Sequence, residues 1–346
     1  MDNLTARPGI LKQANQSYIR RVLRTKGTAT RAELARETGI SPTTVRALLS
    51  GMLENGEIES MGSDPSSGGR KAERYRFRPE RYHGAAICMS VDRVDGLVIN
   101  QCGEIVEYER LPCPDGDLER SALAYLDAQA ERRELRAVGV GGLGVVDGRC
   151  FWRKDRAADA LYKVEIGETI ARRYGLPVVL ENDLNATAIG LARCYGREFP
   201  GERPEDTNLA YLHFDKGCIS AGFIAGGRVL RGWNNFAGEL GLIPVEGERP
   251  LDECMIGAAD DGAYTQRLLG ILCWICGVLN PQYVALGGPD LRKDCLGPVG
   301  DGLFALLPKQ MQAEILYVPD VWHDYRDGMA WLTAGRMFDE VQLVRE

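Results

Sequence analysis

Apolar residues recur with helical spacing three times within the first 55 residues of the chain. The first pattern places Ile19 and Leu23 one turn apart on the same face. The second runs from Thr30 to Gly39, and the third begins at Ser41. The apolar face of the third pattern holds Val45, Leu48, Leu49, Met52 and Leu53. Because this spacing repeats every 3.6 residues rather than every two, it predicts three short amphipathic helices.

The ends of the second and third patterns carry the residues that begin and end helices. Thr30 and Glu33 have the spacing of a capping box, in which each side chain accepts a backbone N–H of the first turn. Gly39 suits the left-handed position that follows a helix. Ser41 precedes Pro42, so we expect Ser41 as the N-cap and Pro42 as the first helical residue.

An alternating pattern follows the third helix. Residues 57–61 read as a strand, residues 62–69 as a turn-rich loop, and residues 70–78 alternate between basic and apolar positions. In this last segment Tyr75 and Phe77 share one face and arginines occupy the other. The segment therefore predicts a β-hairpin with a basic tip.

Helices joined by a glycine turn and followed by a basic hairpin are typical of a winged helix-turn-helix, which we expect over residues 1–81. A plain three-helix bundle is the other interpretation of the helices alone. The polar side chains in the first turn of the third helix and at the hairpin tip are the types that reach base edges and phosphates. The predicted DNA-binding residues are Thr43, Thr44, Arg46, Gly68, Gly69, Arg70 and Lys71.

Charge is distributed unevenly along the chain. The whole sequence has 42 Lys and Arg against 49 Asp and Glu, a net charge of −7. Residues 1–81 hold 15 of the basic and 9 of the acidic residues, a net of +6, which leaves −13 for the remainder. A basic head on an acidic body favours a nucleic-acid partner for the head alone.

Strand and helix patterns alternate from residue 82 to the C-terminus. Strands are expected at 85–91, 96–100, 137–140, 177–180, 209–213, 220–225 and 283–286, with helices near 164–173, 186–193 and up to residue 278. Such alternation predicts an α/β architecture, here of two lobes with a cleft between them.

We recognise no signal for membrane insertion, export or metal binding in the sequence. No apolar run of the length of a bilayer span and no signal peptide is recognised, so we expect a cytoplasmic protein without a membrane partner. The ten cysteines are scattered, and Cys273 and Cys276 lie within an apolar helical pattern where they read as packing residues. Three histidines give no metal-ligand spacing.

Three stretches resemble the ROK family (repressors, open reading frames and kinases). They are residues 181–186 (Glu-Asn-Asp-Leu-Asn-Ala), residues 232–241 and residues 279–288. Together with the helix-turn-helix and its Gly-Gly-Arg hairpin tip, the resemblance to the repressor branch covers nearly the whole chain. It implies an actin-like two-lobed ATPase fold over residues 82–346, a dimer or tetramer, and a sugar or sugar-phosphate in the cleft.

The same resemblance implies the ligand site. Asn182 and Asp183 match the family's sugar-contacting pair, in which the aspartate acts as general base in the kinases, and Glu239 matches a second hydroxyl acceptor. On spacing alone, Asn182 would instead cap a helix while both carboxylates face solvent.

Departures from the family pattern are equally informative. The family's histidine is Leu242 here, and its cysteine-rich zinc loop retains only Cys254. The two phosphate loops read Asp92–Gly96 and Lys216–Gly222 and have lost most of their glycines. Because phosphoryl transfer depends on positioned phosphates, we expect no kinase activity, no cofactor and no metal.

We therefore expect a transcription regulator, a repressor of carbohydrate-related genes, that binds a palindromic duplex as a homodimer and takes a neutral sugar effector. Two alternatives remain at this stage: an active sugar kinase with an accessory DNA-binding head, and a regulator whose cleft is vestigial and only dimerises.

Overall fold

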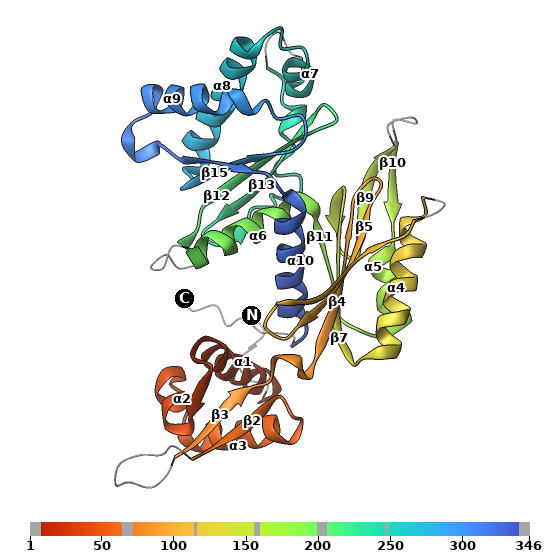
Figure 1. Ribbon diagram of the computed structural model, residues 1–346, viewed down its shortest axis with the longest axis vertical. Coiled ribbons are helices and arrows are strands. Elements are labelled where there is room, and N and C mark those ends of the chain that lie inside the picture. Colours follow the sequence, from red (N-terminus) through yellow and green to blue (C-terminus); the bar gives the residue numbers. More distant parts are fainter. Residues whose placement is uncertain are drawn as a thin grey trace.

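A computed structural model describes residues 8–63, 72–113, 116–155, 160–198, 206–245, 247 and 249–338. The chain is a mixed α/β protein in which a small N-terminal unit is followed by two lobes (Figure 1). The N-terminal unit lies at one end of the long axis, beneath the first lobe in the view of Figure 1.

The N-terminal unit has three helices and a three-stranded sheet. Its elements are α1 (Pro8–Lys26), β1 (Thr28–Thr30), α2 (Arg31–Thr38), α3 (Pro42–Glu54), β2 (Ile58–Ser63) and β3 (Glu73–Phe77). Strand β3 lies between β1 and β2 and is antiparallel to both. The predicted capping box, the left-handed Gly39 and the Ser41 cap are confirmed. Tyr75 and Phe77 share the buried face, as predicted.

A buried ion pair joins the start and the end of this unit. Arg20 of α1 is buried and forms a bidentate pair with the Glu57 carboxylate, with Nη2 to Oε2 at 3.2 Å. The Arg20 guanidinium also lies 4.1 Å from the ring centroid of Phe338, at the far end of the chain. The sequence pattern places Arg20 beside an apolar stripe, and Glu57, the partner that compensates its buried charge, is 37 residues away in the sequence.

The first lobe is built on a five-stranded sheet with the order β11-β7-β4-β5-β6. Its elements are β4 (His83–Met89), β5 (Val94–Asn100), β6 (Ile105–Leu111), α4 (Leu118–Arg132), β7 (Leu135–Gly142), α5 (Ile166–Tyr174) and β11 (Val178–Asn182). A small antiparallel sheet of β8 (Val145–Asp147), β9 (Cys150–Asp155) and β10 (Ala160–Val164) projects from its edge. This small sheet and α4 have no counterpart in the sequence-based expectation.

The second lobe repeats this arrangement with the order β14-β13-β12-β15-β16. Its elements are β12 (Leu209–Asp215), β13 (Cys218–Ala225), β14 (Arg228–Val229), α7 (Leu251–Ile256), α8 (Asp261–Leu279), β15 (Tyr283–Gly287), α9 (Leu296–Leu306) and β16 (Glu314–Val318). In both sheets the first strand is central. The two strands on one side of it are joined by antiparallel pairing, and the two on the other side by parallel pairing.

Two helices separate the sheets. Helix α6 (Asp183–Glu198) packs on the second sheet, and α10 (Val321–Arg336) packs on the first. They cross where neither has a side chain: a Cβ on Gly328 would lie 1.8 Å from the Ala186 carbonyl oxygen, and one on Gly190 would lie 1.9 Å from the Asp324 carbonyl oxygen. The backbones are therefore in direct contact at this crossing.

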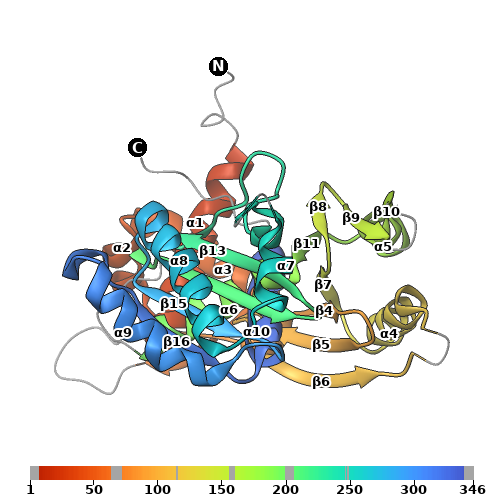
Figure 2. The same cartoon turned by 90° about the horizontal axis from the view of Figure 1, so that it is seen from above.

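Helix α8 corrects one expectation. By length and composition alone it could cross a bilayer, although no such run was expected from the sequence. In the structure its inner face joins the core of the second lobe, where Leu268, Leu272 and Cys276 are buried. Figure 2 shows α8 and α9 together on the outer side of that sheet.

Candidate functional site

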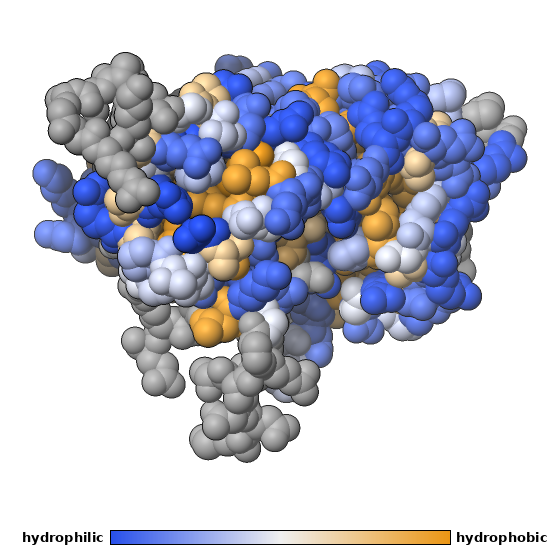
Figure 3. Space-filling model, turned by 90° about the horizontal axis from the view of Figure 1, so that it is seen from below, coloured by the Kyte–Doolittle hydropathy of each residue, from blue (hydrophilic) through white to orange (hydrophobic). Residues whose placement is uncertain are grey.

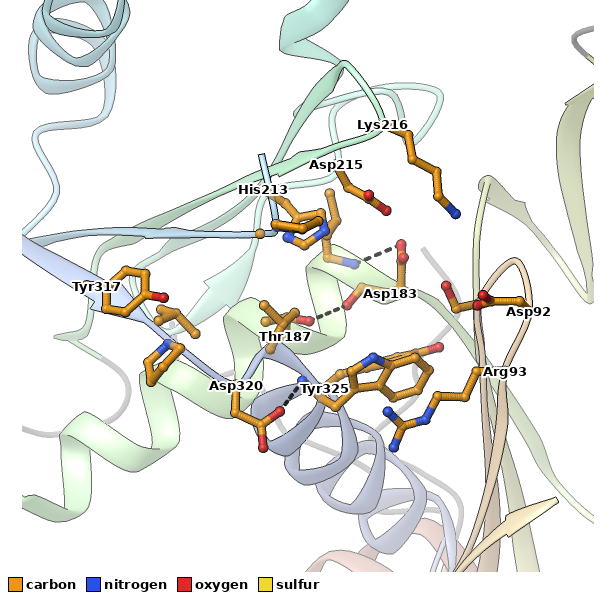
Figure 4. Close-up of a pocket in the computed structure, with 18 of the residues that line it drawn as sticks. Asp92, Arg93, Asp183, Thr187, His213, Asp215, Lys216, Tyr317, Asp320 and Tyr325 are labelled. Carbon is orange, nitrogen blue, oxygen red and sulfur yellow. Dashed lines mark hydrogen bonds between the residues drawn. The ribbon is translucent and has the colours of Figure 1, made fainter. Parts of the chain in front are cut away.

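A cavity of about 580 Å³ lies between the two lobes. Figure 4 shows side chains from four regions converging on it: the β4–β5 turn, the first turn of α6, the end of β12, and the segment from β16 into α10. The labelled polar residues of its lining are Asp92, Arg93, Asp183, Thr187, His213, Asp215, Lys216, Tyr317, Asp320 and Tyr325.

Asp183, the predicted general-base position, is the first residue of α6 and lines this cavity. Its Oδ1 accepts the Leu184 N–H at 3.0 Å. Burial raises the pKa of this carboxyl to about 7, and the Glu239 carboxylate adds to the rise. At neutral pH a substantial fraction of Asp183 therefore carries a proton, so the group can either donate or accept a hydrogen bond.

Asn182 caps α6. Its Oδ1 accepts the N–H groups of Leu184 at 3.0 Å and Asn185 at 3.2 Å, and its Nδ2 donates to the Gly144 carbonyl at 3.1 Å. The side chain thus ties the start of α6 to the first lobe. Asn182 is outside the cavity lining, and its predicted ligand role stays a prediction.

Glu239 lies at the N-cap of a short 3-10 helix, Leu240–Leu242, in the second lobe. Desolvation raises the pKa of its carboxyl, and the Asp252 carboxylate raises it further. The structure brings Glu239 within electrostatic range of Asp183 but leaves it outside the cavity lining. Leu242, at the position of the family's histidine, is 68% exposed.

The segment before Glu239 bridges the lobes. Arg231 is paired with the buried carboxylate of Glu181, and Asn235 Nδ2 donates to the Val146 carbonyl of β8 at 2.7 Å. Asn235 adopts a positive φ of 60°, which asparagine tolerates better than most residues. Sequence reasoning did not find this bridge, because neither pair is close in sequence.

Both turns that resemble phosphate loops are occupied by the protein's own groups. In the second, the Gly217 N–H donates to Asp290 at 2.9 Å and the Ile219 N–H donates to Asp252 at 2.7 Å. These carboxylates satisfy the donors that a phosphate would need, and they would repel it.

In the first turn, the Arg93 side chain is held by other groups of the protein. Arg93 forms a bidentate pair with buried Asp95 at 2.8 and 2.7 Å, and its guanidinium lies 3.8 Å from the ring centroid of Trp322. Among the residues that the structure describes, no group of three metal-ligating side chains occurs.

The N-terminal unit exposes part of the predicted DNA-binding set. Thr43 and Arg46 are exposed on the first turns of α3, while Thr44 is half-buried and its N–H donates to Ser41 Oγ at 3.2 Å. Figure 3 views the molecule from this end, where hydrophilic residues cover most of the surface. The predicted hairpin-tip residues Gly68, Gly69, Arg70 and Lys71 lie outside the described residues.

Curated relatives of this chain are bacterial transcription regulators, several of them named repressors. It is 23% identical over 254 residues to a xylose repressor of Bacillus subtilis, covering 70% of this chain and 64% of the relative. It is 24% identical over 282 residues to the DNA-binding transcriptional dual regulator NagC of Escherichia coli, covering 76% of this chain and 66% of the relative. The chain thus spans about two thirds of the length of these relatives.

Solved structures agree on the fold. A ROK family transcriptional regulator, described as a homologue of the E. coli Mlc protein, superposes with a TM-score of 0.75 at 15% identity over 95% of this chain and 97% of that one. A ROK hexokinase from Thermus thermophilus gives a TM-score of 0.52 at 21% identity, over 72% of this chain and 97% of that one. The body of this chain therefore has the sugar-kinase-like fold.

A family model described as "ROK family" matches residues 85–260, about half of the chain. This range contains the Asn182–Asp183 pair, Glu239, both altered phosphate turns and the bridge between the lobes. The resemblance inferred from the motifs is thereby confirmed, and the chain belongs to the ROK family.

Proposed function

We propose that this protein is a sugar-responsive transcription repressor without kinase activity. Residues 1–81 form a winged helix-turn-helix that binds DNA, and residues 82–346 form the sensor and dimerisation domain. The observation that carries this proposal is the attachment of α2, α3 and the β2–β3 hairpin to a ROK body. The repressor names of its relatives support it, and the repressor role suits a cytoplasmic protein.

The exposed first turn of α3 is the proposed recognition surface. Thr43 and Arg46 would contact base edges or phosphates in the major groove, and the hairpin tip with Arg70 would reach the adjacent minor groove. A helix N-terminus facing outward also favours phosphate. A palindromic duplex follows from a dimer with two such heads.

Selection of duplexes from genomic fragments by the full chain tests DNA binding. We expect Arg46→Ala to weaken binding by about 1–3 kcal/mol, and the affinity of the unsubstituted chain to fall steeply with salt. The exposed Arg36→Ala variant in α2 is the matched control, with a smaller loss. Absence of any duplex binding at low salt would contradict the proposal.

Loss of kinase chemistry is supported by the two turns. The donors of Gly217 and Ile219 are taken by carboxylates, and Arg93 is fixed between Asp95 and Trp322. We expect no sugar-dependent ATP turnover. Turnover that disappears in Asp183→Ala would instead establish the alternative, an active kinase with a DNA-binding head.

For the effector we propose a neutral sugar near Asn182, Asp183 and Glu239. Two carboxylates with raised pKa can exchange hydrogen bonds with hydroxyl groups, whereas they would repel a phosphate or a carboxylate ligand. Xylose and N-acetylglucosamine are the first candidates, because relatives of this chain include a xylose repressor of Bacillus subtilis and an N-acetylglucosamine repressor of Escherichia coli.

A thermal-shift screen of neutral sugars tests the effector. We expect a sugar that raises the melting temperature of the chain, and no such rise in the Asp183→Ala, Glu239→Ala double variant. Stabilisation that survives in the double variant would place the site elsewhere. If no sugar acts, the vestigial cleft becomes the better interpretation.

A further inference from the structure

A second cavity lies on the first lobe, between the edge strand β6 and helix α4. Its volume is about 380 Å³, and it shares no lining residue with the cavity between the lobes. Figure 2 draws α4 beside strands β5 and β6 of the first sheet. This cavity is therefore separate from the candidate sugar site.

The cavity exists because α4 presents small side chains to β6. Ser121, Ala124 and Ala128 follow one another at helical spacing, so they share one face of α4, and all three line the cavity. Tyr125 forms part of the same wall, and its ring packs on β5 at Gly96, where an added Cβ would lie 2.6 Å from the ring. The space beside β6 is thus left by the lack of large side chains on this face of the helix.

A buried carboxamide lines this cavity without a hydrogen-bonding partner for its oxygen. Gln129 is 3% exposed, and its Oε1 accepts no hydrogen bond from any residue that the structure describes. An unpaired buried acceptor costs free energy, and leucine is the ordinary residue at a buried position of an amphipathic helix. Because a half turn of the carboxamide exchanges its oxygen and its nitrogen, Gln129 can present either an acceptor or a donor to a ligand.

Charges of both signs surround the cavity. Arg120 and Arg132 of α4 and Glu109 of β6 all line it. Arg132 Nη1 also lies 3.8 Å from Oε2 of Glu107 on β6. Because cations and carboxylates are interspersed here, the surroundings attract neither an anion nor a cation strongly, and they favour a neutral ligand.

We propose that this cavity binds a neutral, planar ring compound with an amide-type edge, in which an N–H donor stands beside a carbonyl acceptor. Gln129 would pair with that edge through its own donor and acceptor, as glutamine pairs with the edge of adenine. The ring would lie against Tyr125 and the small side chains of α4. A volume of about 380 Å³ is within the range of about 300–1,000 Å³ that is usual for small-molecule sites.

Benzamide and acetophenone are the probes, because the two have nearly the same shape and only benzamide carries the N–H donor. Titrations of the full chain, followed by ligand-observed NMR, measure both dissociation constants. We expect benzamide to bind about 5- to 10-fold tighter than acetophenone, the ratio for one additional hydrogen bond. In Gln129→Leu the two probes should bind equally, and the melting temperature of the ligand-free chain should rise because the unpaired acceptor is gone.

Ala128→Leu tests the site without changing the carboxamide. Leucine fills the space beside β6, so saturable benzamide binding should disappear. Ala130→Leu, at an exposed position of α4 outside the cavity lining, is the matched control and should bind benzamide as the unsubstituted chain does.

Four results would overturn the proposal: no saturable benzamide binding by the unsubstituted chain, equal binding of benzamide and acetophenone, equal benzamide binding by the two alanine variants, or a lower melting temperature of Gln129→Leu. Tighter binding of benzoate than of benzamide would overturn the neutral class of ligand. None of these measurements involves DNA or a sugar. A chain that binds benzamide in this way but binds no DNA would refute the proposed function and leave this site intact.

Discussion

Carboxylates serve opposite purposes in the N-terminal unit and in the cleft. In the N-terminal unit they are partnered: Glu33 accepts the Thr30 backbone N–H and faces Arg74, and its pKa is lowered for that reason. Burial raises the pKa of Asp183 in the cleft to about 7, and that of Asp324, at the crossing of α6 and α10, to about 6. Glu33 thus stabilises the first region, whereas the charged forms of Asp183 and Asp324 oppose folding of the second.

This difference distinguishes carboxylates that stabilise the fold from carboxylates that are typical of binding sites. A carboxylate that is kept in a desolvated place without a strong cationic partner costs stability, and such groups concentrate at sites that bind or react. The raised pKa of Asp183 therefore supports the proposed ligand site, and the carboxylates at the second phosphate-like turn support the proposed loss of kinase chemistry. The following predictions test the contrast, beginning with the largest effect.

Removing the buried partner in the N-terminal unit should have the largest effect. In Glu57→Gln the Arg20 guanidinium stays buried without a counter-charge, which costs about 3–5 kcal/mol. Hydrogen exchange of the α3 amides in the full chain measures this loss. Glu59→Gln, which removes an exposed partner of Arg76, should cost less than about 1 kcal/mol. Equal protection of α3 in both variants would show that the buried pair contributes nothing special.

The cleft should respond with the opposite sign. The folded pKa of Asp183, about 7, lies above its ordinary value of 3.8. The stability that its protonated form contributes is therefore fully present below pH 3.8 and is lost as pH rises through 7. Asp183→Asn should therefore raise stability at pH 8, on the order of 1–3 kcal/mol after allowance for solvent in the open cleft, with a smaller gain at pH 5. Thermal melts at both pH values measure the difference.

The exposed Asp301→Asn in α9 is the control for this melt and should leave the melting temperature unchanged at both pH values. A melting temperature of Asp183→Asn that falls at pH 8 would mean that the charged carboxylate holds the fold together. The contrast between the two regions would then be wrong.

Helix capping should have an intermediate effect. Ser41→Ala removes the acceptor for the Thr44 N–H and should destabilise the N-terminal unit by about 1 kcal/mol. Ser50→Ala on the exposed side of the same helix is the matched control, with a change near zero. Hydrogen exchange of the first turn of α3 distinguishes the two variants, and equal exchange would remove Ser41 as a cap.

Glu33→Gln should have the smallest effect. Glutamine keeps the capping-box geometry and loses only the charge that faces Arg74, so we expect a cost of roughly 0.5 kcal/mol or less at pH 7. Because the folded pKa of Glu33 is lowered, its contribution is present above pH 4.5 and lost as pH falls below that value. The variant and the unsubstituted chain should then become equally stable in acid, and a difference that persists there would contradict this account.

The sequence predicts the N-terminal unit well because its signals are local. Thr30, Glu33, Gly39 and Ser41 act within four residues of their partners, so spacing alone identifies them. The burial of Arg20 was missed because its partner Glu57 is 37 residues away.

The cleft shows more clearly which features sequence patterns cannot predict. The α/β class and the position of Asp183 at a strand end follow from periodicity and motif. The carboxylates that occupy the second phosphate turn, Asp252 and Asp290, come from segments 33 and 73 residues further along the chain. No pattern in the sequence indicates that these side chains return to the turn, since only the folded second lobe brings them there.

The close crossing of α6 and α10 at two glycines restricts which substitutions this protein can tolerate. Any side chain at Gly190 or Gly328 meets a backbone carbonyl oxygen, which cannot move aside as the end of a flexible side chain can. The separation of the two sheets is therefore set by main-chain contact rather than by side-chain volume. Ligand preference in the cleft can then diverge through its lining residues while the distance between the lobes at this crossing stays constant.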